Sequence, residues 1–196
     1  MTLLNNPFVT SGYIAPEYFC DRKRETEELS RWLINENNVA IISTRRMGKT
    51  GLIRHCFQLD EIKENYNTFL IDIYATKTLR EFVFQLGKVL LATLKPKGQK
   101  AWELFVNSLV SLKAGFSLDM SGMPQWNLEL GDIKSPETTL DEIFHYLAVS
   151  DKPCIVAIDE FQQVAQYPEK NTEALLCALP ATARCLPLFQ NLFRTI

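Results

Sequence analysis

Short apolar runs alternate along the chain with longer stretches whose apolar residues recur every three or four positions. The runs, which are rich in β-branched residues, are typical of parallel strands covered on both faces. The longer stretches have the spacing of helices that pack one face on a sheet. The pattern therefore predicts an α/β fold with a parallel sheet flanked by helices. Strands are expected at 38–42, 68–74 and 154–158, and helices at 21–33, 49–59, 78–94, 101–112 and 135–147.

The alternation is interrupted between residues 114 and 132. This stretch contains three glycines and Pro124, and its apolar residues alternate in 116–119 and 126–130. Alternation over short segments with turn residues between them is typical of a β-hairpin. We therefore expect a small hairpin inserted into the α/β pattern, with a ligand- or base-stacking role for Trp126 as the alternative.

The first predicted strand is followed by a loop that opens a helix. The loop ends in Gly48-Lys49-Thr50, as in the GxxxxGK[ST] phosphate-binding signature, with Ser43 in place of the first glycine. Backbone amides at a helix start bind phosphate oxygens. The sequence thus predicts a phosphate-binding loop, and an ordinary strand-turn-helix connection is the alternative. The candidate contacts are Ser43, Arg45, Arg46, Met47, Gly48, Lys49, Thr50 and Gly51.

A second motif closes the predicted strand at 154–158. Two carboxylates, Asp159 and Glu160, follow this strand directly, as in a Walker B strand. In such sites the Asp holds Mg²⁺ and the Glu orients and deprotonates the attacking water. By itself the pair is equally typical of a helix N-cap. Together with Gly-Lys-Thr, it favours a nucleotide site.

Four segments resemble the prokaryotic AAA-like or STAND-type P-loop ATPases: 6–8, 19–25, 43–50 and 159–162. The resemblance implies a P-loop NTPase core that binds ATP and Mg²⁺. It places Lys49 on the β- and γ-phosphates, Thr50 and Asp159 at the metal, and Glu160 at the hydrolytic water.

The resemblance also implies that the segment before the first helix lies near the adenine. Arg22 is the candidate contact to the base or ribose in that segment. Here Asp21 replaces the family's glycine, and Lys23-Arg24 separates Arg22 from Glu25. A solvated charged helix face is the simpler interpretation of these residues.

The pattern is lost after Leu176. Relatives have a strand ending in a polar sensor residue between the two motif strands, and 186–193 could supply it, although Pro187 removes a ladder donor. We therefore expect a fold that is incomplete at the C-terminus, through truncation or a shifted reading frame, in which no sensor, arginine finger or lid can be placed. The predicted division is 1–20 near the nucleotide, 21–176 as the core with the hairpin at about 114–132, and 177–196 as a divergent or truncated tail.

Composition adds less. The chain has 196 residues, is 46% hydrophobic and carries a formal charge of −2, so it can bury a core and has no global attraction to nucleic acid or anionic membranes. Five scattered cysteines without a CxxC pair predict reduced thiols. The start of the chain lacks the pattern of a signal peptide, so a cytoplasmic protein without a membrane partner is expected. His55 and His145 are expected to have structural or surface roles.

Three function classes remain open. The first is an ATPase that hydrolyses ATP in its full-length context, the activity of this chain itself being open. The second is a nucleotide-binding interaction platform without turnover, with self-association or a protein partner. The third is an inactive fragment of a DNA-associated effector ATPase, in which DNA would be bound only by parts absent from this chain.

Overall fold

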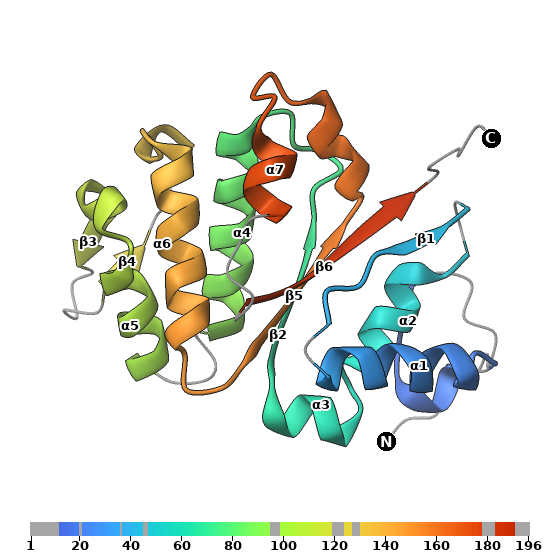
Figure 1. The fold of residues 1–196 in the computed structure, drawn as a ribbon. Helices are drawn as coiled ribbons and strands as arrows, with labels where there is room; N and C mark the ends of the chain where they lie inside the picture. The colour runs from blue at the N-terminus through green and yellow to red at the C-terminus, as the bar shows by residue number, and fades with distance from the viewer. Residues whose placement is uncertain are drawn as a thin grey trace.

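A four-stranded parallel sheet forms the centre of the molecule. The computed structural model describes residues 12–19, 21–35, 37–44, 47–94, 99–118, 124–126, 130–177 and 183–190. The strands are β1 (Ile41–Ser43), β2 (Asn67–Asp72), β5 (Cys154–Asp159) and β6 (Ala183–Gln190), in the order β1-β6-β5-β2 (Figure 1). Because all the pairs are parallel, the carboxyl ends of the strands meet at one edge.

Helices cover both faces of the sheet (Figure 1). Alternate residues of β5 contact different layers, as the period of two in a strand requires. Ile155 and Ala157 pack in one cluster with residues of α1 (Lys23–Ile34), α2 (Lys49–Cys56) and α3 (Asp60–Asn65). Cys154, Val156 and Ile158 pack in the other cluster with α4 (Leu79–Leu94), α5 (Gln99–Ser108) and α6 (Pro136–Val149). The predicted α/β fold with a parallel sheet and flanking helices is confirmed.

The remaining elements are short. Strands β3 (Phe116–Leu118) and β4 (Pro124–Trp126) form the predicted antiparallel hairpin. After β5 come the 3₁₀ helix η5 (Phe161–Gln166) and α7 (Thr172–Cys177). The other 3₁₀ helices are η1 (Pro16–Tyr18), η3 (Val110–Gly115) and η4 (Leu130–Asp132).

Two local expectations need correction. The helix expected at 49–59 ends at Cys56, and a separate α3 begins at Asp60 after an extended Leu59 with φ −62° and ψ 134°. The helix expected at 101–112 ends at Ser108, and the chain continues as the 3₁₀ helix η3 from Val110.

Strand β6 lies in the position that the sequence pattern left in doubt. It runs between β1 and β5, where 186–193 was the candidate strand, so the centre of the sheet is filled by Ala183–Gln190. The division that makes 177–196 a divergent or truncated tail stays a prediction. Its partners change at the proline: Pro187 is the last residue paired with β5, and Leu188 is the first paired with β1. The missing proline donor therefore falls where the strand passes from one neighbour to the other. A shifted reading frame stays a prediction.

Within the described parts of the chain, none of the helices combines the length and apolar character needed to cross a membrane.

Candidate nucleotide site

The turn between β1 and α2 brings the Gly-Lys-Thr residues to the carboxyl edge of the sheet. Gly48 is the N-cap of α2, with φ 70° and ψ 26°, a left-handed conformation that favours glycine. Met47 next to it is 53% exposed. The predicted contacts Arg45 and Arg46 lie outside the described residues.

Lys49, the first residue of α2, is buried although it carries a charge. Its side chain is 5% exposed, and Nζ donates to the carbonyls of Ser43 at 3.0 Å and Thr44 at 3.4 Å. Burial lowers the pKa of Lys49, while Asp159 and Glu160 act in the opposite direction. An ammonium withdrawn from water beside two carboxylates keeps its charge best when an anion also neutralises it. This geometry suits a phosphate ligand.

The two sequence motifs meet at a hydrogen bond. Thr50 Oγ1 donates to Asp159 Oδ2 at 2.5 Å, although the residues lie 109 positions apart. Asp159 is the last residue of β5 and is 6% exposed, so this carboxylate is buried at the end of the strand. The contact joins the start of α2 to the end of β5 directly.

The residues at this contact fit a magnesium ion. A hydroxyl and a carboxylate are the hard oxygen ligands that Mg²⁺ prefers, and Mg²⁺ usually takes its other ligands from water and substrate phosphates. Among the described residues, no group of three or more His, Cys, Asp or Glu side chains could form an all-protein metal cage. The pair therefore suits a metal that arrives with a nucleotide.

Glu160 leaves β5 in an unusual conformation. Its φ is 60° and its ψ 35°, and its amide donates to Asp159 Oδ1 at 3.0 Å. Gln162 Nε2 donates to Glu160 Oε2 at 2.5 Å. The sequence interpretation assigned Gln162 no role of its own, and only its place in the Asp-Glu-Phe-Gln segment could have indicated one.

Arg22, predicted near the base, lies against the phosphate loop. Asp21 and Arg22 both have positive φ, 66° and 102°. A Cβ at Gly48 would lie 3.7 Å from Arg22 Nη1, and Arg22 Nε lies 3.5 Å from Glu25 Oε1. Nη1 is buried and has no hydrogen-bond partner, the one such side-chain atom in the described part of the chain. A buried unpaired guanidinium nitrogen is costly unless a ligand completes it.

An aromatic cluster fastens the preceding segment to α2. Phe19 stacks on His55 with ring centroids 4.2 Å apart, and Tyr13 Oη lies 3.3 Å from His55 Nδ1. Phe19 also lies 3.8 Å from a Cβ placed at Gly51, one of the predicted contacts. Burial lowers the pKa of His55. The stacking and the hydrogen bond are consistent with the structural role expected for His55.

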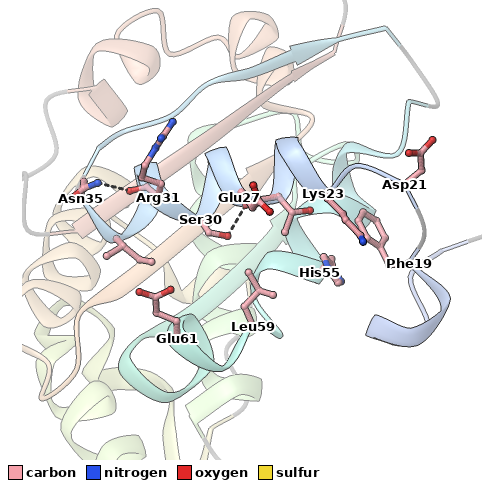
Figure 2. A pocket seen from close by; sticks show the side chains of 12 residues that line it. Phe19, Asp21, Lys23, Glu27, Ser30, Arg31, Asn35, His55, Leu59 and Glu61 are labelled. Atoms are coloured by element: carbon pink, nitrogen blue, oxygen red, sulfur yellow. Dashed lines mark hydrogen bonds between the residues drawn. The ribbon is translucent and has the colours of Figure 1, made fainter.

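A groove with a volume of about 820 Å³ runs along α1, beside the aromatic cluster. Figure 2 shows the α1 side chains Glu27 and Arg31 on one side and His55, Leu59 and Glu61 on the other. Lys49, Thr50 and Asp159 do not line it. The groove is therefore separate from the phosphate loop.

Several sequence expectations concern residues outside the description. They include the segment 6–8 and the side chain of Trp126. Of the cysteines, Cys56 and Cys154 are buried thiols in no disulfide, and burial raises the pKa of the Cys56 thiol to about 11. An unreactive thiol at Cys56 follows.

The solved structures that resemble this fold include a Walker-type ATPase and two ORC proteins. The Walker-type ATPase PABY2304 of Pyrococcus abyssi matches with a TM-score of 0.52 and 19% identity, over 94% of this chain and 49% of its own. ORC1 of Aeropyrum pernix, solved in complex with DNA, matches with a TM-score of 0.50 and 13% identity. The match covers 87% of this chain and 39% of the ORC1 chain. ORC2 of the same organism, solved as ADPNP–ADP complexes, matches with a TM-score of 0.52 and 14% identity. The match covers 87% of this chain and 41% of the ORC2 chain. The chain thus spans half or less of the length of each.

Sequence comparisons add no closer relative. The chain matches no protein-family model, and no curated protein matches it. At these identities the likeness concerns the fold alone. The chain shares with these structures an α/β architecture with a parallel sheet and flanking helices.

Proposed function

We propose that this chain binds ATP with Mg²⁺ at the loop Ser43–Thr50 and, in its full-length context, hydrolyses it as an AAA- or STAND-type ATPase. The observation that carries the proposal is the hydrogen bond between Thr50 and Asp159 beside the buried Lys49. It places an ammonium, a hydroxyl and a carboxylate together at the start of a helix, where phosphate and Mg²⁺ bind favourably.

Each residue of the proposed site has a defined task. Lys49 exchanges its bonds to the loop carbonyls for oxygens of the β- and γ-phosphates. Thr50 and Asp159 would give up their mutual hydrogen bond to hold Mg²⁺ and its water shell, and the ion would supply neutralisation of the phosphate charge. Arg22 donates its unpaired Nη1 to the nucleotide. The loop amides, together with Gly51 at the start of α2, complete the cradle.

The reaction step falls to Glu160. A water oxygen bonds to the γ-phosphorus, the bond from that phosphorus to the bridging oxygen of ADP breaks, and the water proton passes to the Glu160 carboxylate. Backbone geometry supports this role, because the left-handed residue at the end of β5 turns the chain away from the strand directly after the metal ligand. Strained residues of this kind concentrate at functional sites.

The test compares Glu160→Gln with Lys49→Ala. Mg-ATP affinity is measured by calorimetry, and phosphate release is followed with and without Mg²⁺. Glu160→Gln should keep the affinity and lose turnover, since the carboxamide still fits but takes no proton. Lys49→Ala should lose most of the affinity. An affinity for ATP unchanged in Lys49→Ala would overturn the site.

A second candidate is a nucleotide-binding platform without turnover. The observation in its favour is the loop itself, in which Lys49 already bonds to two carbonyls and Ser43 replaces the first glycine. The two candidates separate on one result: Mg-ATP binding without any Glu160-dependent phosphate release, in a longer protein as in this chain, favours the platform. DNA binding by this chain is not part of either proposal, because its net charge is −2.

A further inference from the structure

We propose that Gln162 is a positioning residue that holds the Glu160 carboxylate for proton transfer. The inference rests on the proposed function of Glu160 as the base. Its starting point is the hydrogen bond from Gln162 Nε2 to Glu160 Oε2 at 2.5 Å. A hydrogen bond to a carboxylate is stronger than one between neutral groups, so it restricts the rotation of the carboxylate.

The turn that carries both residues is held in place by packing on the core. Phe161 and Val164 point into the core and are each 4% exposed, and the Gln163 amide donates to the Glu160 carbonyl at 2.9 Å. The backbone between Glu160 and Gln162 is therefore fixed by packing and by one hydrogen bond. Because the backbone keeps the two Cα atoms at a fixed separation, the side-chain hydrogen bond determines the orientation of the Glu160 carboxylate.

A carboxamide is well suited to this position. It donates to one carboxylate oxygen, and because a carboxylate has about four lone-pair sites, this single bond does not use up its capacity to accept a proton. It carries no charge, so it adds no electrostatic repulsion or attraction to that between Glu160 and its charged neighbours Lys49 on α2 and Asp159 on β5. It also does not titrate, so its donor persists at every pH at which Glu160 is ionised.

Gln162 itself is only partly buried, so its removal should cost little stability. We expect Gln162→Met, which keeps the length and loses the donor, to lower kcat for Mg-ATP about 10- to 100-fold. KM and the dissociation constant should change less than about twofold, because binding rests on the loop, Thr50 and Asp159.

Three further variants make the test specific. Gln163→Met is the matched control, since Gln163 meets Glu160 through its backbone amide, which the substitution keeps. Gln162→Glu should lose activity progressively as pH rises, because the introduced carboxyl donates only while protonated and repels Glu160 once ionised. In a Glu160→Gln background, Gln162→Met should cause no additional loss, as expected for residues that act as one unit.

A readout without turnover accompanies the kinetics. Between the NMR spectra of wild type and Glu160→Gln, the side-chain amide signals of Gln162 should shift strongly, and those of Gln163 should not. Unchanged kcat in Gln162→Met, or an increase, would overturn the inference while leaving the proposed function intact. A wild-type chain that shows this NMR coupling but neither binds nor hydrolyses Mg-ATP would instead overturn the proposed function, and the inference with it.

Discussion

Gly48 adopts a backbone conformation that other residues disfavour, and it does so at the point where the proposed phosphate loop joins α2. The nearest atom to a Cβ there is Arg22 Nη1 at 3.7 Å, an ordinary contact. The requirement for glycine is therefore conformational and not steric.

We accordingly predict that Gly48→Ala lowers the free energy of unfolding by about 1 kcal/mol, the cost of a left-handed conformation with a side chain. Gly51→Ala is the control, because Gly51 lies inside α2 with its Cβ position 3.8 Å from Phe19. Alanine there should be neutral or stabilising, since it favours helix. Urea unfolding of both variants checks the difference, and equal destabilisation would contradict it.

The aromatic cluster at His55 should make stability depend on pH. Burial lowers the pKa of His55 below its ordinary 6.5, so the folded chain prefers the neutral ring. The unfolded chain binds a proton first as pH falls, and stability should therefore drop below about pH 6.5 and level off beneath the folded pKa.

The measurement is the unfolding free energy between pH 5 and 8 for wild type and His55→Gln. His145→Gln, at an exposed position of α6, is the control. The decline attributable to His55 should disappear in the first variant and persist in the second. An identical decline in all three proteins would locate the titrating group elsewhere.

At the scale of elements, α2 connects the site to the core. Its first residues carry the proposed nucleotide site, and its inner face packs Leu52, Ile53 and Cys56 against β5 and α1. The position of Lys49 and Thr50 thus depends on packing one turn further along the helix.

Ile53→Ala should lower the free energy of unfolding by about 2–5 kcal/mol, because Ile53 is fully buried and alanine leaves a cavity. Mg-ATP affinity should fall with it as α2 loosens. The exposed Arg54→Ala on the same helix should change stability by less than about 0.5 kcal/mol. Denaturant unfolding with calorimetry distinguishes the two, and full retention of stability in Ile53→Ala would contradict the packing described.

Over the whole molecule, the sequence predicted the strands, helices and fold class that the spacing of apolar residues encodes. The strands β2 and β5 follow from short apolar runs, and the fold class follows from their alternation with helices. The break at Leu59 was missed because it is made by an extended leucine, with neither glycine nor proline to mark it. β6 was left in doubt because Pro187 argues against a central strand unless the change of partner at that residue is known.

The site shows the same division. Gly-Lys-Thr and Asp-Glu were recognisable as motifs, but the bond between Thr50 and Asp159 depends on the order of the strands, which the sequence left open at its centre. Gln162 was missed because a contact across two residues of a 3₁₀ turn leaves no periodic signal.

The most direct test of the central claim is the thermal stability of the chain with and without Mg-ATP, for wild type and Lys49→Ala. A ligand that binds only the native state at 100 times its dissociation constant adds about 2.7 kcal/mol of stability, equivalent to several degrees. The account predicts this shift in wild type and its loss in Lys49→Ala, each measured against its own ligand-free state. An equal shift in both proteins, or none in wild type, would contradict it.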